Sequence, residues 1–182
     1  MEFGLAVTID DSESLPRVWA KDRIVDLYNY LVWSGVEICG WNINHFDIPV
    51  IINNAKKAGW NVLEIEHETI QTFDMFAEIR KHTGRWYGLG VVSEATLGRS
   101  KLADGQLAAE WLRSDDAADF QKAVEYCTSD VEIVRAMYEA WLDAAPIVLP
   151  PRIDRGELNA INWWHYGGFE RVPDATGAVS MK

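Results

Sequence analysis

The chain has 182 residues, of which 48% are hydrophobic, and this length and apolar content predict one globular domain with an adequate core and a small appendage. Its formal net charge of −11 at pH 7 argues against binding nucleic acid by bulk electrostatics, which depends on neutralising phosphates with Lys and Arg. No apolar run is long enough to cross a bilayer and no secretory leader pattern is present, so we expect a soluble, cytoplasmic protein with no membrane partner.

The first part of the chain predicts a hairpin followed by a helix. Residues 3–9 and 15–19 read as extended runs, and a polar turn at 10–14 joins them, which is the pattern of a β-hairpin. A helix is expected next, because apolar residues then recur on one stripe and Gly35 ends the pattern. The stripe consists of Ile24, Leu27, Tyr28, Leu31 and Val32.

Residues 36–52 predict a buried strand that leads into an acidic turn. The run Val36–Trp41 is short, apolar and rich in β-branched residues. It contains Gly40, a residue that allows another group to approach the backbone closely. Asp47 then stands where a helix begins, because Pro49 is tolerated in a first helical turn. A carboxylate is thus predicted at the C-terminal edge of a strand, where open α/β sheets bind ligands. The competing interpretation is that Asp47 is an ordinary N-cap.

The middle of the chain predicts a further strand and several helices. A strand within 65–73 ends at Asp74, which we expect to cap the helix that follows it, and further helices are predicted over 89–97 and 106–112. The stretch 80–101 contains a single acid, Glu94, beside five cations, and is either a substrate rim or a solvated charged face. The cations are Arg80, Lys81, Arg85, Arg99 and Lys101.

A strongly helical pattern covers residues 123–141. Tyr126 and Asp130 stand four residues apart in it, so both lie on one face of the helix. A phenol and a carboxylate on one face suit metal-dependent hydrolysis, or equally a packed Tyr beside a solvated Asp. Cys39 and Cys127 lack metal-type spacing, and we expect them to be reduced core thiols, with contact between them left open.

The composition changes after Ala145, and residues 146–182 are expected to form an extended C-terminal arm with a short helix around 157–164. The aromatic cluster of the arm either stacks on nucleic-acid bases or docks on the domain or a partner, and we favour docking. Its members are Trp163, Trp164, His165 and Tyr166. Residues from Asp174 onward are expected to be disordered.

Four segments, in order, resemble the motifs of the DEDD-type 3′-5′ exonucleases of the ribonuclease H-like superfamily, over roughly residues 3–145. The resemblance is to its predicted exonuclease group, with similarity to the proofreading domain of family B DNA polymerases. The segments are GWNINHFDIPV at 40–50, TFDM at 72–75, ATLGRSKLADG at 95–105 and YCTSD at 126–130. The resemblance implies an α/β fold with a ribonuclease H-like mixed sheet flanked by helices, in which residues 1–145 form the exonuclease domain.

The resemblance also implies a chemistry. Phosphodiester cleavage in this family uses two divalent ions roughly 3.5–4 Å apart, and hard Mg²⁺ or Mn²⁺ ions bind carboxylate oxygens. By resemblance, Asp47 and Asp130 are the metal ligands and Tyr126 orients the attacking water. A substrate-binding role is implied for Asn42, Phe46 and Lys101, with Asn42 holding the turn or a substrate group and Lys101 contacting a phosphate. The implied substrate is the 3′ end of single-stranded DNA or RNA.

One motif of the family is out of place. The family carries an Asp-x-Glu pair on its first strand, whereas Asp11 and Glu13 fall in the predicted hairpin turn, where acids are ordinary residues. By this register the first strand of the family is missing, and residues 3–9 resemble its second strand. Two of the four carboxylates are then absent, and uncovered strand edges invite a protein partner or self-association. A truncated N-terminus or a misplaced start codon would explain both consequences.

Two hypotheses follow. In the first, the chain is a metal-dependent 3′-5′ exonuclease, which is complete only if a segment upstream of Met1 exists or if Asp11 and Glu13 substitute for the missing pair. In the second, it is a catalytically degenerate ribonuclease H-like module that binds nucleic acid or a protein partner.

Overall fold

The computed structural model describes the backbone of residues 1–10, 15–62, 69–102, 105–150, 159–162, 171–173 and 179–181, and the side chains of those up to residue 150. Asp11, Glu13 and the aromatic cluster at 163–166 therefore lie outside the described residues. None of the described helices combines the length and apolar character needed to span a membrane.

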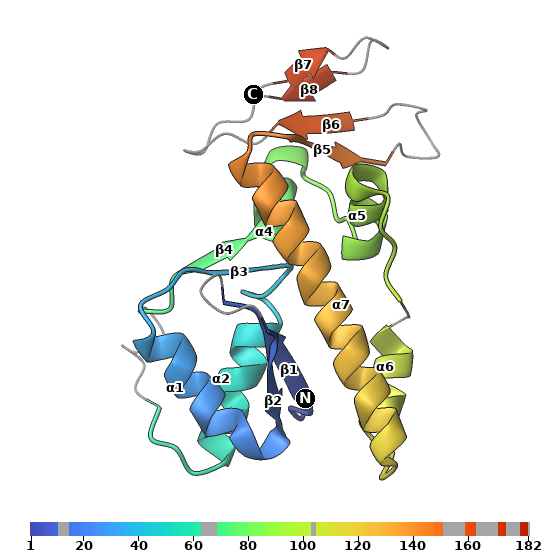
Figure 1. Cartoon of the computed structure of the whole chain (residues 1–182). Coiled ribbons are helices and arrows are strands. Elements are labelled where there is room, and N and C mark those ends of the chain that lie inside the picture. The colour runs from blue at the N-terminus through green and yellow to red at the C-terminus, as the bar shows by residue number, and fades with distance from the viewer. Residues whose placement is uncertain are drawn as a thin grey trace. The chain divides into compact units, whose positions relative to one another are not determined.

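The chain divides into two compact units (Figure 1). The first unit comprises residues 1–75 and 102–132, and the second comprises residues 76–101 and 133–182. The predicted division between an exonuclease domain at 1–145 and an arm at 146–182 stays a prediction. Every residue discussed below as part of the carboxylate site belongs to the first unit.

The strands of the first unit form two separate pairs within the described residues. The predicted hairpin is confirmed: β1 (Leu5–Thr8) runs antiparallel to β2 (Arg17–Ala20). The predicted central strand is β3 (Ile38–Gly40), and it runs parallel to β4 (Thr72–Asp74), with Gly40 opposite Asp74. Each pair is a two-stranded sheet of its own, so the predicted mixed sheet is seen as one antiparallel piece and one parallel piece.

Helices cover these strands and build the core of the first unit. A 3₁₀ turn, η1 (Lys21–Arg23), leads into α1 (Ile24–Trp33), and α2 (Asp47–Lys57) packs against α1. The predicted stripe of α1 is buried, together with Phe3, Trp19, Ile51 and Ala55. Burying each large apolar side chain contributes roughly 1.5–3 kcal/mol, so this cluster stabilises the packing of α2 on α1 and on the residues of the hairpin. The first unit also contains α6 (Gly105–Trp111) and the first part of α7 (Ala117–Leu142).

A buried amide ties the start of the chain to α2. Asn54 donates hydrogen bonds to the carbonyl oxygens of Val50 (2.8 Å) and Met1 (3.2 Å), and its side-chain oxygen accepts one from the amide of Phe3 (3.1 Å). Because a buried amide is tolerated only when it is hydrogen-bonded, these three contacts explain a polar residue on the core side of α2. They hold the helix that begins at Asp47 in a defined place.

The second unit contains most of α4 (Met75–Thr83), α5 (Leu89–Leu97) and a four-stranded sheet. The sheet order is β5 (Pro146–Leu149), β6 (Asn159–Asn162), β8 (Val179–Met181) and β7 (Arg171–Pro173). Strand β5 is joined to α5 through Thr96, whose hydroxyl accepts from the amide of Val148 (3.0 Å) and donates to its carbonyl (3.2 Å).

Two expectations for the C-terminal arm are wrong where the structure describes it. The helix expected around 157–164 is replaced by strand β6 at Asn159–Asn162, and a strand at Val179–Met181 stands inside the stretch expected to be disordered. The physical reason is pairing: β5 offers hydrogen-bonding groups along its length, with Ile147 opposite Ile161. A reading of local sequence patterns does not include a partner strand that lies elsewhere in the chain.

Gly40 supplies the first testable prediction. A Cβ atom on Gly40 would lie 2.2 Å from the Cγ2 atom of Ile43, which is far inside van der Waals contact, so Gly40→Ala should cost about 1–3 kcal/mol of unfolding free energy through overpacking. Chemical denaturation would measure this loss. Gly88→Ala is the matched control, since its new Cβ would meet nothing closer than 3.9 Å. Equal stability of the two variants would contradict the close approach at Gly40.

Candidate carboxylate site

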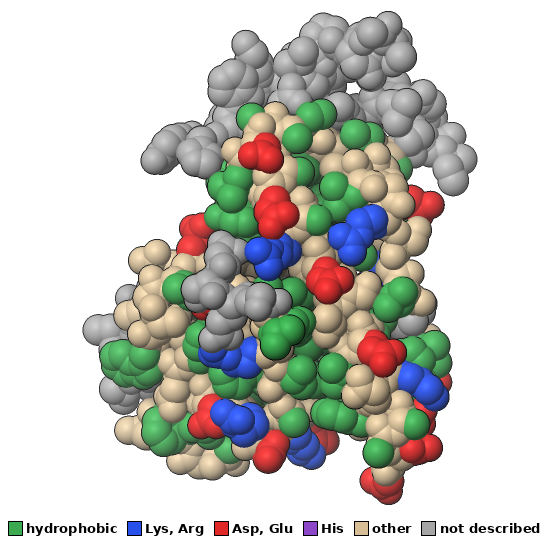
Figure 2. Space-filling model, viewed as in Figure 1, with side chains coloured by type: hydrophobic (Ala, Val, Ile, Leu, Met, Phe, Trp, Pro, Cys, Tyr) green, Lys and Arg blue, Asp and Glu red, His purple; other side chains and the backbone are tan. Residues whose placement is uncertain are grey.

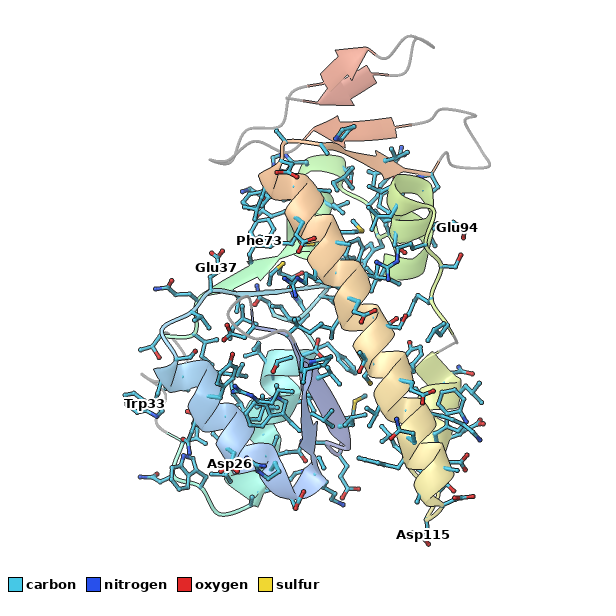
Figure 3. The ribbon with its side chains drawn as sticks, viewed as in Figure 1. Asp26, Trp33, Glu37, Phe73, Glu94 and Asp115 are labelled. Carbon is cyan, nitrogen blue, oxygen red and sulfur yellow. The ribbon has the colours of Figure 1, made fainter. Side chains whose placement is uncertain are left out.

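Asp74 organises the turn that follows β3. One of its carboxylate oxygens accepts a hydrogen bond from the amide of Asn42 (2.8 Å), and the other accepts one from the amide of Asn44 (3.0 Å). The residue is only 3% exposed, and hydrogen bonds to a charged acceptor contribute about 1.5–3 kcal/mol each. Asp74 therefore brackets the turn from the neighbouring strand. Figure 3 marks this strand pair with Glu37, which precedes β3, and Phe73, which lies in β4.

From sequence alone we expected Asp74 to cap the helix that follows it, and this expectation missed its hydrogen bonds to the turn after β3. The parallel pairing of β3 and β4 places Gly40 opposite Asp74, and parallel strands bring their C-terminal ends to one edge of a sheet. The sequence contained a signal for this pairing, because both strands had been expected, and polar residues lie at Asp74 and at Asn42, two residues after β3. Whether Asp74 also caps α4 stays a prediction.

The backbone of the turn explains why Asn42 stands at its start. Asn42 has a positive φ of 60°, a left-handed conformation that Asn tolerates better than most residues. The turn then winds toward α2, with the amide of Phe46 donating to the carbonyl of Asn42 (3.1 Å) and that of Ile48 to Ile43 (3.0 Å). The backbone of Asn42 is thus part of the turn, and a contact of its side chain with substrate stays a prediction. Its side-chain oxygen is buried and has no hydrogen-bond partner among the described residues.

Asp47 is the first residue of α2 rather than its N-cap. The N-cap position belongs to Phe46, which makes no side-chain capping bond, so the N-cap interpretation of Asp47 is wrong. Phe46 is 46% exposed, and its ring is accessible to a ligand. The turn bracketed by Asp74 therefore presents Phe46 and Asp47 side by side in the sequence at the start of a helix.

The carboxyl group of Asp47 is harder to ionise than usual. Its pKa is raised to about 6: burial among protein atoms is the main cause, a backbone hydrogen bond opposes the shift, and the negative charge of Asp74 adds to it. Asp47 as a whole is nonetheless solvent-exposed. The two observations are compatible, because the exposed area is that of the whole residue, whereas the pKa depends on the surroundings of the carboxyl group alone. Water still reaches the side chain, so screening keeps the associated free energy small.

The other predicted site residues occupy defined places in the two units. Tyr126 (7% exposed) and Asp130 (half-buried) lie one turn apart on α7, in the first unit, and the hydroxyl of Tyr126 lies close to Gly105 at the start of α6. Their convergence on Asp47 stays a prediction. Lys101 belongs to the second unit, where its aliphatic stem lies against Gly90 of α5.

The donor set around Asp47 suits one hydrated divalent ion. No group of three or more His, Cys, Asp or Glu side chains within the described ranges is placed to hold a metal. Mg²⁺, however, is commonly held by one or two carboxylates and keeps several waters. Asp47 offers one carboxylate, whose negative charge is disfavoured by the neighbouring charge of Asp74. A cation would relieve the repulsion between the two acids, so the fit is to a single ion rather than to a two-ion cluster.

Cys39, in β3, is excluded as a reactive thiolate or soft-metal ligand. Burial is the main cause that raises the pKa of its thiol to about 12, and the charges of Glu37 and Asp74 add to it. The thiol is therefore protonated at neutral pH, whereas the thiolate is the nucleophilic and metal-binding form. Both cysteines are reduced thiols, as the sequence predicted, and both are half-buried.

Comparison with known families agrees with a mixed α/β fold. The family model of the RNase H superfamily matches residues 10–142, which is more than half of the chain. The protein therefore belongs to the RNase H superfamily, and its described part is a mixed α/β structure of six α-helices and short strands. No curated protein and no solved structure matches the chain.

The second prediction concerns Asp74. Asp74→Asn keeps one acceptor oxygen and loses the other, so one turn amide loses its partner, and unfolding free energy should fall by roughly 1.5–3 kcal/mol. Urea denaturation measures the change. Asp115→Asn serves as the control, since Asp115 is an exposed acid in the turn before α7 (Figure 3), and it should change stability by no more than about 0.5 kcal/mol. Unaltered stability of the Asp74 variant would show that the bracket is energetically unimportant.

The third prediction is a pH dependence. The folded pKa of Asp47 lies above its unfolded value of about 4, so the folded state binds more protons between about pH 4 and pH 6 and its stability falls as pH rises through that window. Asp47→Asn removes this loss. In metal-free buffer above pH 6 the variant should melt higher, by at most roughly 2–4 °C because the exposed group is screened.

Thermal melts from pH 4 to pH 8 would check this, with Asp115→Asn again as the control. The gain from Asp47→Asn should shrink as pH falls from about 6 to about 4, because the wild-type carboxyl group is then protonated in the folded state and about half protonated in the unfolded state. A gain of equal size at every pH would mean that the substitution acts through packing and not through charge.

Proposed function

We propose that the protein is a metal-dependent 3′-5′ exonuclease that hydrolyses phosphodiester bonds at the 3′ ends of single-stranded DNA or RNA, and that it acts in the cytoplasm. The observation that carries the proposal is the carboxylate site: Asp74 brackets the turn after β3, and Asp47 follows that turn with a raised pKa. Membership of the RNase H superfamily supports a nuclease-like activity on nucleic acid.

Each candidate residue has a chemical role in this proposal. When bound, Mg²⁺ or Mn²⁺ acidifies a water molecule and stabilises the charge that develops on the phosphate. Asp47 and Asp130 hold the ion, and Tyr126 orients the attacking water. Asn42 and Phe46 contact the terminal nucleotide, since they flank the same turn. Lys101 contacts a phosphate of the substrate.

The charge distribution supports local rather than global recognition of the substrate. Figure 2 shows Lys and Arg side chains interspersed with Asp and Glu side chains on the face in view, with no continuous basic surface among the residues coloured there. The net charge of −11 has the same implication. Binding of a polyanion then depends on a divalent ion at the carboxylates and on a few cations and aromatic rings, not on counterion release over a broad surface.

The second candidate function is a catalytically degenerate module that binds nucleic acid or a protein. Two observations favour it: the described residues include no group of three or more His, Cys, Asp or Glu side chains that could hold a metal, and the strands of the first unit form two separate two-stranded sheets. Two-stranded sheets leave outer strand edges with unpaired backbone groups, and such edges pair readily with another chain. A protein partner or a second copy would bind there.

The fourth prediction separates the two candidates. Incubation with Mg²⁺ or Mn²⁺ should remove a 3′ label from a single-stranded oligonucleotide at once and shorten a 5′-labelled one into a ladder. Asp47→Ala and Asp130→Ala should each slow the reaction at least about 100-fold, since even outer-shell partners of metal ligands are worth about 10–100-fold. Asp115→Ala, which removes an exposed acid elsewhere, should cleave at the wild-type rate.

Metal binding gives an independent readout of the same proposal. A ligand that binds only the folded state raises its melting temperature, so Mn²⁺ should raise the midpoint of the wild type and of Asp115→Ala but not that of Asp47→Ala. Oligonucleotide binding without turnover, and without a metal-induced shift, would favour the degenerate module. Full activity in both aspartate variants would refute the site.

A further inference from the structure

An exposed tryptophan in the second unit lies on a preformed support. Trp86 follows α4 and is 64% exposed. The ring of Phe76 lies 4.9 Å from its ring, centroid to centroid, and the guanidinium carbon of Arg80 lies 4.3 Å from the indole centroid. Both partners belong to α4. The indole and the guanidinium therefore form a stacked pair at the surface, and this pair is held in place from the helix side.

The loop that carries Trp86 also lines a cavity. The cavity measures about 450 Å³ and is lined by Thr83, Gly84, Arg85, Trp86 and Tyr87. Thr83 holds the loop to the helix end, because its hydroxyl donates to the carbonyl of Ile79 (2.7 Å) and accepts from the amide of Arg85 (3.1 Å). This volume lies in the range of small-molecule sites and accommodates a nucleoside.

One residue of the loop carries a buried hydroxyl group. The hydroxyl of Tyr87 is buried and makes no hydrogen bond within the part of the chain that the structure describes. A buried hydroxyl without a partner costs free energy. The cavity itself is lined by two aromatic residues of the loop, Trp86 and Tyr87.

The charges of this region distinguish Arg80 from its neighbour. Lys81 pairs with Glu78 at 3.6 Å, whereas the guanidinium of Arg80 lies over the indole of Trp86. A guanidinium stacked on an aromatic ring keeps its outer face and its positive charge available, and nucleic-acid bases stack on such planes. Arg85 adds a second cation to the cavity wall.

We propose that Trp86 and Arg80, with the adjoining cavity of residues 83–87, form a stacking site for a base of single-stranded nucleic acid. This inference rests on the proposed exonuclease function, to which it adds a substrate contact in the second unit. Stacking on aromatic and guanidinium planes is tolerant of sequence, so the site binds any base, and Arg80 and Arg85 favour the attached phosphates. This contact assigns a role to part of the basic stretch 80–101.

The test measures binding in metal-free buffer, where no cleavage occurs. The probes are a fluorescein-labelled oligothymidylate and an oligomer of the same length with abasic sites throughout, followed by fluorescence anisotropy. The wild type should bind the oligothymidylate about tenfold more tightly than the abasic oligomer. Trp86→Ala should bind both equally, because it has lost the stacking surface and kept the cations.

Arg80→Lys is the second variant, and it leaves the aromatic packing in place. The substitution preserves the positive charge and removes the planar guanidinium group. The variant should therefore lose most of the preference for bases, whereas the salt dependence of its binding should keep the wild-type slope. Trp33→Ala is the matched control, since Trp33 is 71% exposed at the end of α1 in the first unit (Figure 3). It should bind both oligomers as the wild type does.

The outcomes separate this inference from the proposed function. A wild type that binds both oligomers equally, or a base preference that survives in both Trp86→Ala and Arg80→Lys, overturns the stacking site. That result leaves metal-dependent cleavage and its dependence on Asp47 untouched. Conversely, a base preference lost in both variants, in a protein that cleaves no oligonucleotide with any divalent ion, supports the stacking site and refutes the exonuclease.

Discussion

The two hydrogen bonds from the turn amides to Asp74 are the constraint on which the candidate site depends. They join the end of β4 to the turn after β3 across 32 residues of sequence, and they fix the left-handed conformation at Asn42. A carboxylate accepts two amides in this geometry at modest desolvation cost, because the hydrogen bonds replace lost water. The start of α2, and with it Asp47, is placed as a result.

This arrangement has an electrostatic consequence. Burial is the main cause that raises the pKa of Asp47 to about 6, and the negative charge of Asp74 adds to it. Two acids held near each other favour a bound cation, which suits the divalent ions that the RNase H superfamily typically uses. Asp74 therefore both stabilises the turn through its two hydrogen bonds and adds to the negative charge beside Asp47.

The separate strand pairs of the first unit connect the fold with the two candidate functions. A hairpin and a parallel pair that do not share a sheet leave backbone groups for another strand to satisfy. A strand that brought further carboxylates to the edge beside Asp47 would favour the exonuclease, whereas a strand without them would favour a binding module. The same open architecture thus bears on both catalysis and association.

The sequence by itself determined the local elements. The buried stripe of α1 and the bounds of α5 follow from the spacing of apolar side chains. The end of α1 follows from Gly35, which has a positive φ. It also marked Asp47 as the acid at the start of a helix. These features depend on neighbours within a few residues.

Only the tertiary structure decided what depends on distant partners. The role of Asp74 needs amides 30 and 32 residues away, β6 needs the edge of β5, and the support of Trp86 needs Phe76 and Arg80 on another element. The raised pKa of Asp47 likewise comes from its surroundings in the fold. Hydrogen bonding, stacking and desolvation act through space, so a pattern read along the chain identifies the groups but not their partners.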